Sequence, residues 1–442
     1  MQDWLTMTAA DLGRGIGEGQ IDPVGLCKTY LEAIDAHPLR DQIYARVTAD
    51  RAMSEARAAS VRAKKGQRLS PLDGVPISWK DLFDTADVAT EAGSLLLKDR
   101  VPLNDAQVLQ NATAMGLVCL GKTHMSELAF SGLGHNPSTA TPPCVNDRGA
   151  VSGGSSSGAA ASVAFGLAAA AIGSDTGGSV RIPSAWNDLV GLKTTAGRVS
   201  LKGVVPLAKQ FDTVGPLCRS VEDAGLLLAA LEGTKSPDLT SADLEGRRLA
   251  ILQTVAMDDL AEIPAAAFAS AVEKLRDAGA IVEDLNFRDL ENAMPLSGCL
   301  FTVEAYGQWR DVIEANPDAM YAEILERFRL GKSHSGPDYV AAWAKLEGIR
   351  ELYARATAGF DAVILPTAPI TPPKLERLEG DHDYYVSSNL LALRNTRIGN
   401  LMGVCAMTLP TGTASCGLML MAASGSEERL LRLAAAAEEA LA

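Results

Sequence analysis

The first 65 residues place apolar and polar positions at the spacing of amphipathic helices. Apolar side chains recur at roughly helical intervals, at Ala10, Leu12, Leu26, Tyr30, Leu31 and Ile34. Glycine and proline between Gly13 and Pro23 interrupt this periodicity, which predicts two helices instead of one. Residues 52–65 are rich in alanine and arginine and predict a surface helix that ends before Gly66. We therefore expect residues 1–65 to form a helical N-terminal part.

From residue 66 onward, short apolar runs alternate with helical stretches. Residues 72–81 predict a turn and a short strand that ends in a lysine, and residues 116–121 predict a second buried strand after a helix at 105–115. Further predicted strands lie at 189–193, 249–252, 281–285 and 361–365, and predicted helices at 220–231, 264–278 and over most of 290–358. Residues 204–206 and 212–216 are predicted as loops, and Ser424-x-x-Glu427 as a capping box that opens the last helix. Strands that alternate with helices indicate an α/β fold with a parallel or mixed sheet.

The stretch from Val151 to Pro183 is the most unusual part of the chain. It contains a Gly-Ser run, an apolar segment of small residues and a second Gly-Ser turn. The apolar segment, residues 159–172, is shorter than the roughly 20 residues that cross a membrane, so we predict a buried core helix and no membrane partner. Residues 131–158 are rich in Gly, Pro, Ser and Asn, and an irregular stretch of this length is typical of a functional loop.

Composition and charge narrow the classes of function. The chain has 442 residues and a formal net charge of −14, which argues against nucleic acid as a partner. Its seven cysteines are scattered without a C-x-x-C pair, and its five histidines show no H-E-x-x-H spacing. We therefore expect no disulfide framework, no metal, no cofactor and a reducing cytoplasmic location. No signal peptide is evident, and the absence of a linker favours a single domain over residues 1–442, with a core at 66–240 and a remainder at 241–442.

A serine nucleophile is one candidate chemistry, because it needs a base and an oxyanion hole that Gly-Ser turns can help to build. Residues 154–158 match G-x-S-x-G with Ser156 at the centre, as in an esterase of the α/β-hydrolase type. That site needs a strand upstream and a histidine downstream, whereas the upstream segment is predicted as a loop and the downstream histidines are His334 and His382. A phosphate-binding loop is not supported, since neither glycine-rich phosphate motif is present.

Three motifs in order resemble the amidase signature family: GVPISWKD at 74–81, GGSSSG at 153–158 and DTGGSVRIP at 175–183. Ser155 and Ser179 are separated by 24 positions, which is the spacing of the family. Shorter motifs from Lys122 to Gly403 extend the resemblance over nearly the whole chain. The resemblance implies a large mixed central β-sheet covered by helices on both faces.

The resemblance also implies the roles of the site residues. Ser179 would be the nucleophile, Ser155 a bridging serine on a cis peptide bond, and Lys80 the base. The backbone N–H groups of Thr176, Gly177, Gly178 and Ser179 would form the oxyanion hole. Lys80 must then be neutral, although the pKa of a free lysine is about 10.4, and burial would lower that pKa. Without the motifs, Lys80 would instead be a solvated lysine paired with Asp84, and the serines would cap helices.

Other residues are less constrained by the pattern. Ser131, Gly132, Leu133 and Gly134 are candidates for substrate binding, and Arg198 either borders the pocket or has a structural role. Arg181 is expected to pair with Asp175. The chain departs from the common family pattern at Ser157, Thr194, Cys405 and residues 186–188. These departures remove no catalytic group, but they leave the substrate open because pocket walls are what vary.

The sequence therefore predicts an amidase that hydrolyses a small or aryl carboxylic amide, and it leaves open whether ester or carbamate (urethane) bonds are cleaved as well. Two alternatives remain: the glutaminase subunit of a tRNA-dependent amidotransferase, and an esterase centred on Ser156. A small-molecule amide is the expected partner, and the sequence leaves the oligomeric state open, with a homodimer as one option.

Overall fold

The N-terminal part of the chain is helical, with one short strand that the apolar pattern does not predict. In the computed structural model, which describes residues 2–442, helix α1 covers Ala9–Gly17 and α2 covers Pro23–Ala36. A single turn α3, Arg40–Ile43, leads to strand β1, Tyr44–Val47, and then to α4, Ala49–Lys64. Asp22 caps α2 through the N–H of Gly25, and Pro23 occupies the first position of the helix. The break between the two predicted helices is confirmed.

A single sheet runs through the molecule. Within residues 2–442 it has eleven strands in the order β1-β3-β2-β4-β6-β5-β10-β11-β9-β7-β8. The strands after β1 are β2 (Pro76–Lys80), β3 (Val118–Thr123), β4 (Ala170–Asp175), β5 (Val190–Lys193), β6 (Thr213–Cys218), β7 (Arg248–Leu252), β8 (Ile281–Leu285), β9 (Ala362–Pro366), β10 (Cys405–Pro410) and β11 (Gly417–Ala422). β2 is parallel to β3 and β4, and β7 is parallel to β8 and β9, whereas the other pairs are antiparallel. The predicted mixed α/β sheet is confirmed.

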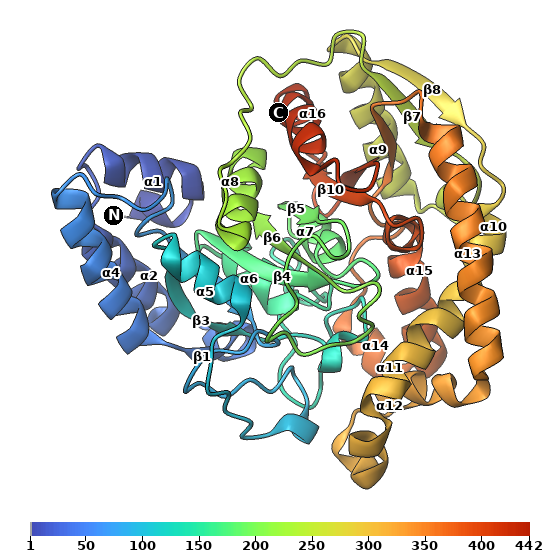
Figure 1. Ribbon diagram of the computed structural model, residues 1–442, viewed down its shortest axis with the longest axis horizontal. Helices are drawn as coiled ribbons and strands as arrows, with labels where there is room; N and C mark the ends of the chain where they lie inside the picture. Colours follow the sequence, from blue (N-terminus) through green and yellow to red (C-terminus); the bar gives the residue numbers. More distant parts are fainter. Residues whose placement is uncertain (1) are drawn as a thin grey trace.

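Helices cover both faces of this sheet (Figure 1). They are α5 (Gln107–Ala114), α6 (Ser157–Ala164), α7 (Arg181–Trp186), α8 (Val221–Glu232), α9 (Glu262–Asp277), α14 (Leu375–Gly380), α15 (His382–Leu401) and α16 (Glu427–Leu441). Short 3-10 turns lie at Leu95–Leu97, Glu127–Ala129, Thr254–Ala256, Pro317–Ala319 and Leu330–Ser333. α5, α8, α16 and α9 contact one another in a row, while α6, α7 and α15 form a second group. The sheet core between them is almost completely buried.

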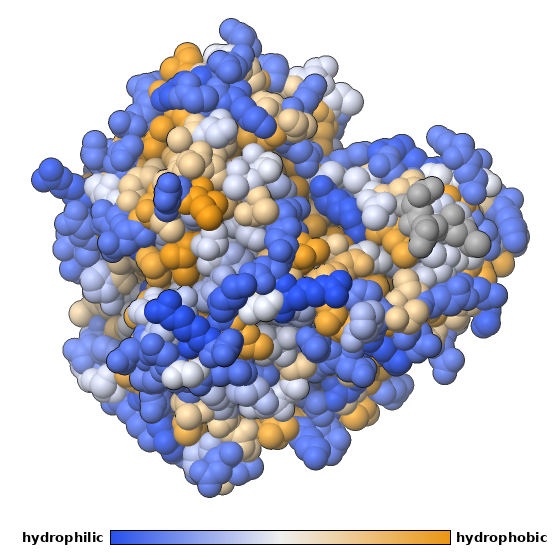
Figure 2. Space-filling model, turned by 180° about the vertical axis from the view of Figure 1, so that it is seen from behind, coloured by the Kyte–Doolittle hydropathy of each residue, from blue (hydrophilic) through white to orange (hydrophobic). Residues whose placement is uncertain are grey.

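A helical lobe projects on the side opposite the N-terminal helices (Figure 1). It consists of α10 (Leu290–Ala293), α11 (Leu296–Ala315), α12 (Ala322–Arg329) and α13 (Gly336–Thr357), as the apolar pattern over 290–358 predicts. Leu346, Ile349 and Tyr353 of α13 are buried, and Trp343 stacks on Phe211. The surface seen in Figure 2 is mostly hydrophilic, with hydrophobic residues in separate small groups. Every helix in the described part of the chain is too short or too polar to cross a membrane.

The apolar segment 159–172 is not the single helix that its composition predicts. α6 ends at Ala164, and the chain then reverses through Gly166, whose φ is +73°. This is a conformation that glycine adopts without strain. Residues 170–175 continue as β4 in the middle of the sheet. A run of alanines suits a short helix and a buried strand alike, so apolar content alone does not separate them.

Two other predictions were wrong: one took a strand for a loop, and the other placed the start of the last helix too early. Residues 213–218 form β6 and not a loop, because pairing with β4 on one side and β5 on the other outweighs the weak strand preference of Gly215 and Pro216. The last helix begins at Glu427 and Ser424 does not cap it. The Glu427 carboxylate instead accepts hydrogen bonds from the N–H of Thr195 and from Arg198. The prediction of one domain over residues 1–442 remains a prediction, which the continuity of the sheet supports.

Candidate active site

Two neighbouring strands and the turns beside them bring the motif residues together. Lys80 is the last residue of β2, and β2 lies parallel to β4. Ser155 lies in the turn before α6, and Ser179 lies in the turn that joins β4 to α7. The N–H of Ser156 donates to the carbonyl oxygen of Ser179 at 3.2 Å, so the two turns are in direct contact. The order of the strands therefore brings Lys80 and Ser155 into contact, although they are 75 positions apart in the sequence.

The Lys80 amine is the centre of a buried hydrogen-bond group. Its side chain is completely buried, and Nζ donates to Ser155 Oγ at 2.7 Å and to Ser174 Oγ at 2.8 Å. The Gly154–Ser155 peptide bond is cis. Burial lowers the pKa of Lys80 to about 7, although the negative charges of Asp175 and Asp212 oppose this change. A large fraction of Lys80 is consequently a neutral amine near pH 7 and can accept a proton.

Asp175, at the end of β4, holds the turn that carries Ser179. Its carboxylate accepts hydrogen bonds from the N–H groups of Gly178 at 2.9 Å and Val180 at 3.1 Å. It also pairs with Arg181 at 2.9 Å, and both side chains are fully buried. Burial alone would raise the pKa of Asp175, but the charge and hydrogen bonds of Arg181 outweigh it and lower that pKa. The predicted pairing of Arg181 with Asp175 is confirmed.

The turn after β4 leaves fewer N–H groups for an oxyanion than the family resemblance implies. Because the N–H of Gly178 already donates to Asp175, Gly178 drops out of the expected oxyanion hole. Glycine is still required at this position, since its φ is +143° and an added Cβ would lie 2.1 Å from Thr396 Oγ1. The N–H groups of Thr176, Gly177 and Ser179 have no such internal acceptor among the described residues. They remain candidates for the oxyanion hole.

A cavity of about 150 Å³ lies beside Ser179. Ser131, one of the expected substrate-binding residues, lines this cavity together with Thr176 and Gly177. The structure places the other three members of that loop elsewhere. Gly132 accepts a hydrogen bond from the N–H of Gly154, Leu133 is buried in a separate apolar cluster, and a Cβ on Gly134 would lie 2.4 Å from the carbonyl oxygen of Gly153.

Gly132, Leu133 and Gly134 therefore position the turn that carries Ser155 and do not line the cavity. This corrects the expectation that they bind substrate: the backbone of Gly132 and Gly134 and the side chain of Leu133 make contacts within the protein.

Arg198 also lies away from the cavity. Its guanidinium donates to Glu232 at 2.7 Å and to Glu427 at 2.6 Å, and it pairs with Glu428. These contacts join the segment after β5 to α8 and α16. Of the two roles that the sequence allowed, the structure supports the structural one, and the substrate-binding role of Arg198 was wrong.

Ser156 lacks the surroundings of a hydrolase nucleophile. It is fully buried, and its Oγ donates to the carbonyl oxygen of Ser174 at 3.2 Å. No strand precedes it directly in the described chain. His382, which a triad would need nearby, instead contacts Glu323 on the surface. The esterase alternative centred on Ser156 is therefore rejected.

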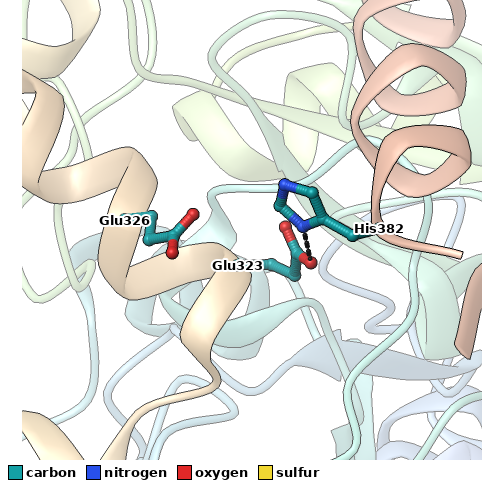
Figure 3. A group of neighbouring side chains, drawn as sticks. All are labelled: Glu323, Glu326 and His382. Carbon is teal, nitrogen blue, oxygen red and sulfur yellow. Dashed lines mark hydrogen bonds and ion pairs between the residues drawn. The ribbon is translucent and has the colours of Figure 1, made fainter.

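The surface group around His382 is also the one place within residues 2–442 where three His, Cys, Asp or Glu side chains could share a metal ion. It contains Glu323 and Glu326 of α12 and His382 of α15 (Figure 3). His382 Nδ1 lies 2.5 Å from Glu323 Oε1, and the His382 side chain is 58% exposed. This geometry is that of a surface ion pair between two helices.

Two residues of the site were not predicted from the sequence. Ser174 contacts Lys80 directly, and Asp212 accepts a hydrogen bond from Thr176 Oγ1 at 2.6 Å. Residues two positions apart on a strand share a face. If residues 170–175 had been predicted as a strand, that rule would have placed Ser174 on the same face as Ile172. The apolar composition of the segment predicted a helix instead, so this signal was missed. Nothing in the local sequence of Asp212 indicates its contact with Thr176.

Comparisons with known proteins agree with this geometry. A family model described as Amidase matches residues 26–431. A 2-amino-5-chloromuconic acid deaminase from Comamonas testosteroni is 35% identical, over 87% of this chain and 85% of its own. One subunit of the glutamyl-tRNA(Gln) amidotransferase from Acidothermus cellulolyticus is 33% identical, over 100% of this chain and 95% of its own.

Solved structures extend the likeness to the fold. A crystal structure described as an amidase has a TM-score of 0.88 at 29% identity and covers 99% of this chain and 100% of its own. The native peptide amidase from Stenotrophomonas maltophilia has a TM-score of 0.82 at 27% identity and covers 98% of this chain and 96% of its own. The chain therefore belongs to the amidase family and is an amidohydrolase that acts on C–N bonds.

Proposed function

We propose that the protein hydrolyses a small carboxylic amide through an acyl-enzyme on Ser179, with a proton relay from Ser155 to Lys80. The observation that carries the proposal is the 2.7 Å hydrogen bond between Lys80 Nζ and Ser155 Oγ, directly beside the turn that carries Ser179. A buried lysine with a pKa of about 7 is suited to general-base catalysis at neutral pH.

The relay works in two half-reactions. Neutral Lys80 takes a proton from Ser155, which takes one from Ser179, and the Ser179 oxygen attacks the amide carbon. The N–H groups of Thr176, Gly177 and Ser179 stabilise the oxyanion. The proton on Lys80 then returns through Ser155 to the amine, the C–N bond breaks, and the amine leaves. Water attacks the ester on Ser179 by the same relay and releases the carboxylic acid and free Ser179.

The cavity beside Ser179 supports a small substrate. Its volume of about 150 Å³ is on the scale of a compact ring or a short chain, not of a protein segment. Anilides, esters and carbamates have the same electrophilic carbon, so we extend the proposal to small members of these classes. The deaminase relative is named for a small organic acid, which fits this size.

A second candidate function is the glutaminase subunit of a tRNA-dependent amidotransferase. The observation behind it is the 33% identity to an amidotransferase component over the full length of this chain. We favour the stand-alone amidase because the solved structures that resemble this chain include a peptide amidase. Purified chain that hydrolyses amides without a partner supports the amidase, whereas activity with glutamine that appears only in a complex supports the amidotransferase.

The proposal extends to the setting of the protein. All seven cysteines are buried and unpaired, which supports a reducing, cytoplasmic location. A homodimer, one of the assemblies that the sequence leaves open, is part of this proposal, and light scattering on the purified chain tests it directly.

The central experiment replaces the nucleophile. We expect Ser179→Ala to lower kcat on any hydrolysed amide by about 10⁴-fold or more and to abolish covalent labelling by a fluorophosphonate. Ser156→Ala is the matched control in the same Gly-Ser region and should retain the label. Amide hydrolysis at the wild-type rate in Ser179→Ala contradicts the mechanism.

A further inference from the structure

One charged side chain in the cavity beside Ser179 has no partner in the protein. Arg397 of α15 lines this cavity, and its Nε is buried without a hydrogen-bond acceptor. Among the described residues, no ion pair or hydrogen bond is formed by the Arg397 side chain. Arg181, by contrast, is held by Asp175, Asn400 and the carbonyl oxygen of Thr396.

The surroundings make this isolation costly. Arg397 is partly buried, and a cation that is partly removed from water is normally paired, because desolvation without a partner is unfavourable. In the part of the chain that the structure describes, the one charged side chain that shifts the pKa of Arg397 is Arg327, which has the same sign. Burial and then Arg327 lower the pKa of Arg397 to about 10, so Arg397 is still a cation at neutral pH. An unpaired cation that is kept in an active-site cavity is a place for an anion.

The rest of the lining fits a small anion with a short carbon chain. Among the described residues that line the cavity, none is acidic, and Ser131 and Asn389 are neutral hydrogen-bonding groups. Phe130, Phe301 and Leu393 supply apolar walls. Arg327 lies with its guanidinium over the Phe130 ring, 5.7 Å from the centroid, and donates to the Phe130 carbonyl oxygen. That hydrogen bond uses one of the N–H donors of Arg327. The guanidinium of Arg397 therefore has more N–H groups available to bind a carboxylate than the guanidinium of Arg327.

We propose that the substrate is a small amide that also carries a carboxylate, as in the monoamide of a short dicarboxylic acid, and that Arg397 binds this carboxylate. Arg397 and Ser179 line the same cavity, so one short molecule contacts both. The inference rests on the proposed function, because it names the substrate class of the same site. Arg397 is then the residue that distinguishes charged from neutral amides.

The test compares matched substrates and matched variants. The probes are malonamic, succinamic, glutaramic and adipamic acids, each set against the neutral aliphatic amide of equal chain length, with ammonia release as the readout. The variants are Arg397→Met, Arg397→Lys and, as control, Arg394→Met. Arg394 lies one turn earlier on α15 but donates to carbonyl oxygens of Ala256 and Asp258, outside this cavity.

We expect wild type to prefer one of the four acids over its neutral partner. Arg397→Met should lower kcat/KM for that acid by about 10- to 100-fold, mainly through KM, and change the neutral amide by less than about threefold. Arg397→Lys should restore part of the loss, and Arg394→Met should leave the preference intact. An equal loss on charged and neutral amides, or a wild-type preference for the neutral amides, overturns the inference.

A binding measurement separates this inference from the catalytic mechanism. Succinate and glutarate are titrated calorimetrically into Ser179→Ala and into Ser179→Ala with Arg397→Met. Binding that disappears with Arg397 supports the carboxylate site even if the relay is wrong, whereas binding unchanged by the substitution overturns it. Amide hydrolysis of neutral substrates alone, with fluorophosphonate labelling intact, upholds the proposed function and rejects the charged substrate class. Should Arg397→Met fail to fold, the wild-type preference and Arg397→Lys still decide.

Discussion

The pH dependence of activity is the most direct check on the role of Lys80. Burial lowers the pKa of Lys80 from 10.5 to about 7. This change corresponds to a preference for the neutral amine of about 5 kcal/mol. At pH 7 about half of the protein then holds a neutral Lys80, against about one molecule in 3,000 if the pKa were unchanged.

The sign of the effect follows from the relay. Only the neutral amine accepts a proton from Ser155, so activity rises as pH increases through the pKa of Lys80. With a pKa of about 7, kcat/KM at pH 5 should be about 100-fold below its value at pH 9, with a slope of one on the acid limb. The assay is ammonia release from one neutral amide between pH 5 and 9, with circular dichroism to verify that the fold persists over this range.

A second buried lysine provides the control. Burial lowers the pKa of Lys193 to about 8, and its Nζ donates to the carbonyl oxygens of Thr194 and Val404, away from the serines. Lys193→Met should leave the acid limb in place, provided that the variant is folded. An acid limb that moves in Lys193→Met, or a rate that is constant from pH 5 to 9, refutes the assignment of Lys80 as the base.

The same change in pKa affects stability. Between pH 7 and 10.5 the unfolded chain holds a proton on Lys80 that the folded protein has released. The contribution of Lys80 to the free energy of unfolding therefore increases with pH across this window. Lys80→Met should be inactive, and its unfolding free energy, measured with urea, should rise less steeply from pH 7 to 9 than that of wild type.

Three further substitutions test the supporting contacts. Ser174→Ala removes one acceptor of the Lys80 amine and should lower kcat by roughly 10-fold with KM little changed, measured by steady-state kinetics. Arg181→Met leaves the buried carboxylate of Asp175 without its cation and should lower the free energy of unfolding by about 3–5 kcal/mol, measured with urea. Arg198→Ala separates Glu232 and Glu427 from their shared partner, so we expect a lower Tm while kcat/KM stays within about twofold of wild type.

Each of these expectations has a contrary result. A wild-type kcat in Ser174→Ala shows that Ser155 alone orients the amine. Wild-type stability in Arg181→Met contradicts the account of Asp175 as the anchor of the Ser179 turn. A large loss of kcat/KM in Arg198→Ala, without loss of stability, indicates that Arg198 binds substrate after all.

The sequence by itself determined the candidates for the catalytic groups. Lys80, Ser155 and Ser179 lie in motifs whose order and spacing are local properties of the chain. The start of the helix after Ser220 was also predictable, because a capping side chain acts on a backbone N–H only three residues away. Segments with one pattern and two possible structures were not: residues 159–172 divide into a helix and a strand, and β6 forms in spite of Gly215 and Pro216.

Only the tertiary structure decided which of these residues meet. Strand order places Lys80 beside Ser155 and Ser174, and it carries Arg198 to Glu427 instead of to the cavity. It also uses the N–H of Gly178 for Asp175 and leaves Arg397 as an unpaired cation beside Ser179. The physical reason is that a hydrogen bond or an ion pair depends on positions in space. Residues distant in sequence acquire those positions only when the sheet and its covering helices have assembled.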